Sequence, residues 1–164
     1  MEHFNAASEE DLEQALLSCL HSHRWAGRVA DHRPYPDLAS LLAAADEAAY
    51  DLGWSDLTEA LAAEPLPALP PDTYAAAHTA LSAAHAAYEA RFGHVFVICL
   101  DGLSPSETLD RLLAAIRSRL TNDPEEERAV VADELRRLAS GRLVSALRGA
   151  GNCANNHSAP APGR

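Results

Sequence analysis

One short apolar run, Val95-Phe96-Val97-Ile98-Cys99-Leu100, interrupts a chain that otherwise has the composition of packed helices. It follows Gly93, a residue type that ends helices by adopting a positive φ, and it precedes Ser104-Pro105, a helix start signal. Its aromatic and β-branched residues predict an extended segment. One extended segment cannot form a sheet, so its backbone groups need partners from the protein, from water or from a ligand. The run is therefore a candidate ligand site or, alternatively, a core segment without a ligand.

The rest of the chain predicts an all-α, single-domain helical bundle. Of its 164 residues, 48% are hydrophobic, many of them alanine, and only 5% are aromatic, which favours helices over sheets. Residues 149–164 are Gly, Asn, Ala and Pro-rich and predict a disordered tail behind a domain of residues 1–148. A first helix is expected to begin at Ser8, and a second, short helix is expected to end near Asp31. Further helices are expected over 37–50, 54–63, 107–120 and 124–147, and another from a cap at Asp72 or Thr73 to Arg91.

Charge and hydropathy exclude several classes of partner. The net charge of −11 repels nucleic-acid phosphates and anionic membranes, so we expect neither as a partner. No apolar stretch approaches the roughly 20 residues that a membrane-spanning helix needs. The beginning, Met1 to Phe4, lacks the basic and apolar regions of a signal peptide. The three cysteines are far apart and suggest reduced thiols, so a cytoplasmic location is expected.

The chemically active side chains do not form a metal or phosphate motif. His21 and His23 lie two residues apart, which would point them to different faces of a helix, and no metal site is predicted. His78 and His85 share one side of an alanine-rich helix and are expected to be structural. Arg142 lies on a largely apolar helix face. There its guanidinium suits either a substrate carboxylate or an intramolecular ion pair.

Four groups of residues resemble sequence motifs of the OHCU (2-oxo-4-hydroxy-4-carboxy-5-ureidoimidazoline) decarboxylases, which act in urate degradation. They are Trp25 with Arg33-Pro34-Tyr35, the block from Tyr88 through Arg91-Phe92-Gly93 to Cys99, Arg119-Leu120-x-Asn122, and the closing block from Glu134 to Arg142-Leu143. The resemblance runs from Phe4 to about Leu147, over nearly all of the predicted domain.

This resemblance implies a cofactor-independent carboxy-lyase that converts OHCU to (S)-allantoin in purine catabolism, with an all-helical fold and usually a homodimer. The implied substrate site comprises Pro65, the backbone of Phe96, Val97, Ile98, Cys99 and Leu100, and Arg142, which would hold substrate oxygens.

The chain departs from the family pattern at the acid–base residues. Glu64 precedes Pro65 where the family has a catalytic histidine, so Glu64 is the candidate catalytic residue. The segment Leu66 to Tyr74 is too short for the family's Ser-x-x-Glu-Gln motif, and His85 replaces a usual asparagine. His78 or His85 could supply a proton instead. The alternative function is a catalytically impaired or repurposed member that binds a small anionic metabolite or a protein partner.

Overall fold

The computed structural model describes residues 1–69 and 73–154, and within these ranges its secondary structure is entirely α-helical, as predicted. The helices in chain order are α1 (Glu2–Ala6), α2 (Glu9–Cys19), α3 (His23–Asp31), α4 (Leu38–Tyr50), α5 (Trp54–Ala63), α6 (Ala75–Phe92), α7 (Pro105–Arg119) and α8 (Pro124–Ala154). Helix α1, of five residues, was not predicted from the sequence. No helix in the described ranges is long and apolar enough to cross a membrane.

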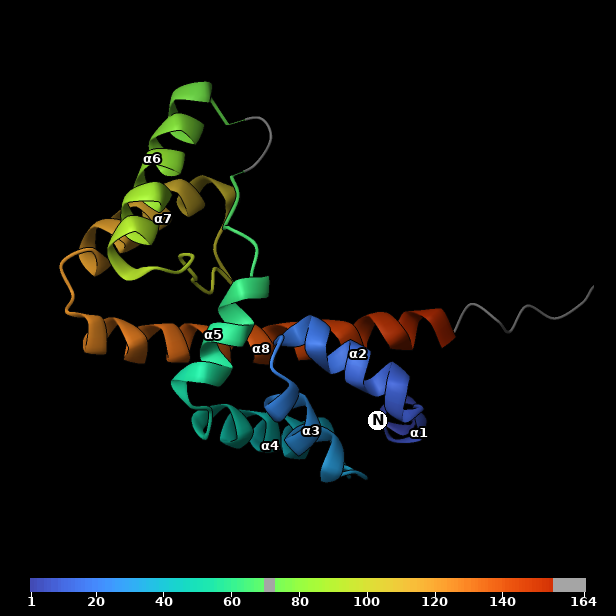
Figure 1. The fold of residues 1–164 in the computed structure, drawn as a ribbon. Coiled ribbons are helices and arrows are strands. Elements are labelled where there is room, and N and C mark those ends of the chain that lie inside the picture. Colours follow the sequence, from blue (N-terminus) through green and yellow to red (C-terminus); the bar gives the residue numbers. More distant parts are fainter. Residues whose placement is uncertain (70–72, 155–164) are drawn as a thin grey trace, which may run out of the picture.

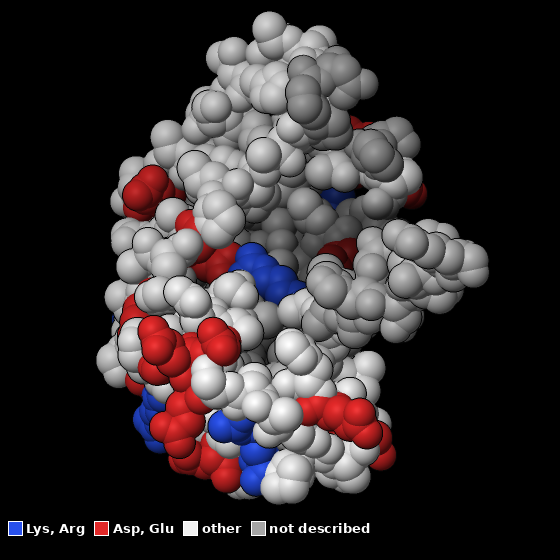
Figure 2. Space-filling model, turned by 90° about the vertical axis from the view of Figure 1, so that its right-hand side faces the viewer, with Lys and Arg blue, Asp and Glu red and all other residues white. Residues whose placement is uncertain are grey.

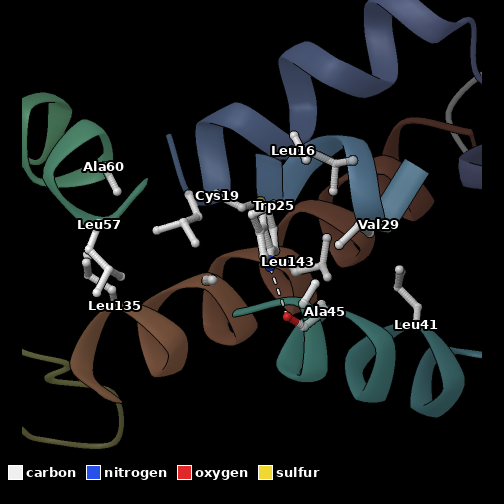
Figure 3. Packing of buried hydrophobic residues seen from close by; sticks show 14 of the residues in the cluster. Leu16, Cys19, Trp25, Val29, Leu41, Ala45, Leu57, Ala60, Leu135 and Leu143 are labelled. Atoms are coloured by element: carbon white, nitrogen blue, oxygen red, sulfur yellow. Dashed lines mark hydrogen bonds between the residues drawn. The ribbon is translucent and has the colours of Figure 1, made fainter. Parts of the chain in front are cut away.

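Helix α8 runs the length of the molecule and supports the other helices (Figure 1). Its apolar face packs with α2, α3, α4 and α5 into a first hydrophobic cluster. Trp25 lies at the centre of this cluster, where its indole Nε1–H donates a hydrogen bond of 2.9 Å to the carbonyl oxygen of Ala45 (Figure 3). This bond satisfies the polar atom of a fully buried aromatic side chain.

A second hydrophobic cluster lies between α6 and α7, which form the upper part of the molecule in Figure 1. The extended segment joins the two clusters because its side chains alternate in direction, as in a strand. Val97 is buried in the first cluster, whereas Phe96 and Ile98 are buried in the second. The sequence therefore builds one domain around two clusters with a shared apolar segment.

Helix termini follow the predicted caps at most places. The Ser8 hydroxyl accepts a hydrogen bond from the backbone N–H of Asp11, which satisfies one of the free amides that begin α2. Gly93 ends α6 with φ = 77°, the left-handed conformation that glycine adopts most readily. Ser104 and Glu107 form a reciprocal capping box at the start of α7.

Two predicted boundaries differ from the structure. The N-cap of α6 is Tyr74 rather than Thr73, and Asp72 lies outside the described residues. Helix α8 continues to Ala154, beyond the predicted beginning of the tail at Gly149. Glycine disfavours a helix by only about 1 kcal/mol relative to alanine, and no proline occurs before Pro160 to stop the helix. The remainder of the predicted tail, 155–164, lies outside the described residues.

Candidate active site

One buried arginine and one buried glutamate hold the extended segment in place. The Arg119 guanidinium donates to the carbonyl oxygen of Val97 at 2.5 Å, and the Glu134 carboxylate accepts from the backbone N–H of Cys99 at 2.7 Å. Ile98, between them, has no hydrogen-bond partner for its N–H or its C=O within 1–69 and 73–154. The backbone of Ile98 is therefore free to bind another group.

Arg142 and Glu64 face each other across the end of α5 and the middle of α8. Two parallel hydrogen bonds of 2.7 and 2.8 Å join the guanidinium to both oxygens of the carboxylate. The guanidinium also donates to the carbonyl oxygen of Cys19 at 3.1 Å. The Glu64 side chain is 5% exposed and that of Arg142 is 33% exposed, so solvent screens the pair only partly. The hydrogen bonds to Glu64 raise the pKa of Arg142, which stays charged.

This ion pair separates two cavities. One, of about 220 Å³, lies against the extended segment, and its lining comprises Glu64, Pro65, Leu66, Pro67, Val97, Ile98, Leu100, Asp101, Leu138 and Arg142. The other, of about 420 Å³, shares Glu64, Pro65 and Arg142 with the first, and its far wall includes Ser18 and His21. Acidic and basic side chains are visible inside a recess between the upper and lower parts of the molecule in Figure 2. A small ligand in either cavity would touch the ion pair.

The structure brings together most of the predicted site residues. Glu64, Pro65, Val97, Ile98, Leu100 and Arg142 all line the cavity beside the extended segment. Phe96 and Cys99 do not. Phe96 points away into the second cluster, where its ring lies 4.4 Å from the Arg119 guanidinium carbon, and Cys99 is fixed by Glu134. The Phe96 side chain is thus part of the support behind the cavity, and Cys99 contributes its backbone N–H to that support.

The cavities are also lined by Asp101, Leu138 and His21, which were not predicted from the sequence. Asp101 lies against α8 at Gly141, where an added Cβ would be 2.3 Å from the Asp101 carboxylate oxygen. A glycine next to Arg142 was the only signal for this close approach. His21 precedes α3 and was considered only as a metal ligand. No group of three or more His, Cys, Asp or Glu side chains that could hold a metal ion occurs in the described part of the chain.

The cavity holds few groups that exchange protons. Glu64 accepts two hydrogen bonds from a guanidinium. Burial raises the pKa of the Cys99 thiol and that of the Cys19 thiol, so both stay protonated. Neither His78 nor His85 lines the two cavities. His85 is buried in α6 and stacks on Phe96 with ring centres 6.0 Å apart.

Comparison with known proteins shows the family. The model of the OHCU decarboxylase family matches residues 5–69 and 67–144. The chain belongs to the OHCU decarboxylase family. This family consists of carboxy-lyases that act on a small molecule. The two matched parts overlap at residues 67–69, within the segment Leu66 to Tyr74, where the sequence of this chain departs from the pattern of the OHCU decarboxylases.

Two crystal structures share the fold of this OHCU decarboxylase family member. An OHCU decarboxylase in the presence of (S)-allantoin is 22% identical, with a TM-score of 0.70 over 85% of this chain and 97% of that one. An (S)-allantoin synthase is 19% identical, with a TM-score of 0.69 over 88% of this chain and 53% of that one. The chain thus spans about half of the synthase. No protein of curated function matched in sequence.

The buried imidazole of His85 predicts a dependence of stability on pH. Burial lowers the pKa of His85, and its Nε2 has no hydrogen-bond partner among the described residues. The His85 imidazole therefore binds a proton more readily in the unfolded chain than in the folded protein. As pH falls below the ordinary histidine pKa of about 6.5, this difference lowers the free energy of unfolding.

The variant His85→Asn should lose this component of the pH dependence. Urea unfolding of both proteins at several pH values between about 5 and 8 measures it. The free energy of unfolding of the wild type relative to the variant should decline on the acidic side only. A constant difference across the range would show that His85 titrates alike in both states. His78→Asn is the matched control, because His78 is only half-buried on the same helix.

Proposed function

We propose that this chain decarboxylates 2-oxo-4-hydroxy-4-carboxy-5-ureidoimidazoline to (S)-allantoin without a cofactor. The observation that carries the proposal is the placement of the Arg142 guanidinium and the unpaired backbone of Ile98 at one cavity. The guanidinium suits the carboxylate of the substrate, and the N–H and C=O of Ile98 suit the amide groups of a ureido-imidazoline. Membership of the OHCU decarboxylase family supports the same reaction.

The reaction needs an anion to be stabilised and then protonated. The C–C bond to the carboxylate breaks, CO₂ leaves, and the bonding electron pair remains on the ring as an enolate-like anion. One proton delivered to one face of the ring then gives a single enantiomer. A positioned acid or base typically accelerates such a step by about 10²–10⁴-fold.

Two side chains of the cleft are suited to this proton transfer. Glu64 occupies the position of the family's histidine and, as a carboxylate, can accept a proton from the substrate. His21 lines the adjoining cavity with Glu64 and Arg142, and an imidazole ring has nitrogens that can donate and accept a proton. We propose that Glu64 takes the proton of the substrate 4-hydroxyl as CO₂ leaves and returns it to the product, while His21 supplies the one proton that replaces CO₂ on the ring and recovers it from water in the open cavity.

The optical activity of the allantoin formed from freshly generated OHCU tests the function. OHCU decays spontaneously to racemic allantoin, so catalysis appears as rapid accumulation of one enantiomer. Racemic product at the uncatalysed rate would contradict the decarboxylase function. The assay needs only the purified full-length chain without additives, since no cofactor is proposed.

The variant His21→Gln tests the proton donor separately. We expect it to lower the rate of formation of the single enantiomer by about 100-fold, because a positioned acid is lost. His23→Gln is the matched control, since His23 pairs with Glu59 at 2.9 Å and lines neither cavity. Equal rates for both variants and the wild type would exclude His21 while leaving the proposed reaction intact.

A repurposed binding protein is the second candidate function. It is favoured by the same ion pair, because Glu64 already neutralises the guanidinium that a substrate carboxylate would need. The variant Glu64→His, which introduces the family's residue, separates the candidates. If only this variant produces (S)-allantoin, the natural chain has lost the reaction. The homodimer implied by the resemblance and the cytoplasmic location expected from the cysteines stay proposals, and sedimentation and fractionation would test them.

A further inference from the structure

A third cavity, of about 220 Å³, lies where the end of α6, the start of α5 and the start of α8 meet. Its lining includes the basic side chains Arg91, His94 and Arg128 and the aromatic side chains Trp54 and Phe92. It shares no lining residue with the two cavities at the Glu64–Arg142 pair. It is therefore a separate candidate site.

Both arginines of this cavity are positioned by aromatic rings. The guanidinium carbon of Arg128 lies 4.7 Å from the centre of the Trp54 ring, and that of Arg91 lies 5.2 Å from the Phe92 ring. Arg91 also donates a hydrogen bond of 2.8 Å to the carbonyl oxygen of Asn122. These contacts limit the rotamers of both side chains and leave most of their N–H donors unused.

Neither arginine has a carboxylate partner within 4 Å in the described part of the chain, although acidic residues outnumber basic ones by 24 to 13. Two carboxylates near Arg128 at the start of α8 have other partners. Asp123 accepts from the backbone N–H groups of Glu125 and Glu126, and Glu126 accepts from the N–H of Asp123. The first turn of α8 thus uses these acids as caps, and the two guanidinium groups remain available.

His94 lies beside the arginines and adds a third donor or acceptor. Its ring contacts Trp54, Tyr88 and Phe92 with ring centres 5.7, 5.5 and 6.2 Å away. Because the carbonyl oxygen of Val95 can only accept, the Nδ1 of His94 donates to it at 3.0 Å. This contact leaves Nε2 for a ligand, as an acceptor when the ring is neutral and as a donor when it is protonated.

We propose that this cavity binds a small oxyanion with two negative charges, a phosphate or a dicarboxylate. Two guanidinium groups that converge on one small cavity match two charged oxygens, and the planar fork of arginine suits both phosphate and carboxylate. The aromatic walls would contact the carbon skeleton of a dicarboxylate, whereas a free phosphate would use the donors alone. This site is independent of the decarboxylase reaction.

Calorimetric titration of the full-length protein with inorganic phosphate and with succinate, in low salt, tests the proposal. We expect saturable binding of at least one probe, weakened about tenfold or more by R91Q and by R128Q, because each removes charge-assisted hydrogen bonds. R117Q is the matched control, since Arg117 is exposed on α7, has no ion pair in the described residues and carries the same charge. Thermal unfolding of each variant checks that it is folded.

Each outcome decides the proposal. Phosphate binding alone would identify a phosphate group as the ligand chemistry, and succinate binding alone a dicarboxylate. No binding of either probe up to about 10 mM would overturn the proposal. Equal weakening by R117Q and the two site variants would also overturn it, since it would indicate attraction to charge in general. The formation of allantoin by the same samples reports on the decarboxylase function separately.

Discussion

Replacement of Arg142 by alanine is expected to lower kcat/KM for the formation of (S)-allantoin by at least about 100-fold. The variant removes both hydrogen bonds to Glu64 and the one to the Cys19 carbonyl, and it leaves a carboxylate that is 5% exposed without its cation. Loss of one partner of such a pair typically costs about 2–5 kcal/mol. Steady-state kinetics with optical detection of the product measures the effect.

Two further variants separate charge from geometry at this position. Arg142→Lys keeps the positive charge but cannot form two parallel hydrogen bonds, so we expect it to restore only a part of the activity. Arg137→Ala, on the same helix, removes an exposed partner of Asp133 and should retain the wild-type rate. Wild-type kinetics in Arg142→Ala would show that the substrate binds elsewhere, even if the chain is a decarboxylase.

Replacement of Glu127 by alanine is expected to destabilise the protein by about 3–5 kcal/mol, the typical cost of leaving one charge of a buried pair uncompensated. Glu127 is 1% exposed and pairs with Arg119 at 2.6 Å. It also accepts hydrogen bonds from the Tyr88 hydroxyl and from the Asn122 side-chain amide, the latter at 2.8 Å. Burial and the bond to Glu127 raise the pKa of Tyr88, so its hydroxyl remains the donor.

Chemical denaturation of Glu127→Ala and of a surface control measures this cost. Asp51→Ala breaks the ion pair with Arg28, in which the Arg28 side chain is 39% exposed and the Asp51 side chain is 50% exposed. This variant should change the free energy of unfolding by at most about 1 kcal/mol. Similar losses for the two variants would contradict the role assigned to the buried network. Since Arg119 also holds the Val97 carbonyl, the Glu127 variant should loosen the extended segment beside the candidate site.

The sequence predicted the helices well because their ends carry local signals. Ser8, Gly93 and the Ser104–Glu107 pair act on the backbone directly beside them, so their effects do not depend on the rest of the fold. Where such signals are absent, prediction was poorer. The short α1 was missed, and the end of α8 was placed at a glycine that the helix passes through.

The candidate site could be predicted only in part. Resemblance and the unpaired extended segment both indicated the region, and the two interpretations of Arg142, ion pair or ligand site, meet in one cavity with Glu64. Which residues of the segment line the cavity could not be predicted, because alternating apolar residues fit either orientation. The resemblance implied the backbone of Phe96 and Cys99 as part of the site, but neither residue lines the cavity: the Phe96 side chain lies in the second cluster, and the Cys99 backbone N–H donates to Glu134. His21 was missed because its neighbours in space are distant in the sequence.

The side chains of the extended segment pack alternately into the two hydrophobic clusters. Ligand binding beside this segment therefore depends on how the two clusters are docked on each other. Val97 can stay in the first cluster, and Phe96 and Ile98 in the second, only while both clusters keep their mutual position. If that docked arrangement is populated for only a fraction of the time, the apparent affinity falls by the same fraction. Substitutions deep between α6 and α7 would therefore weaken ligand binding without touching the cavity, and a bound ligand would slow amide exchange in both halves.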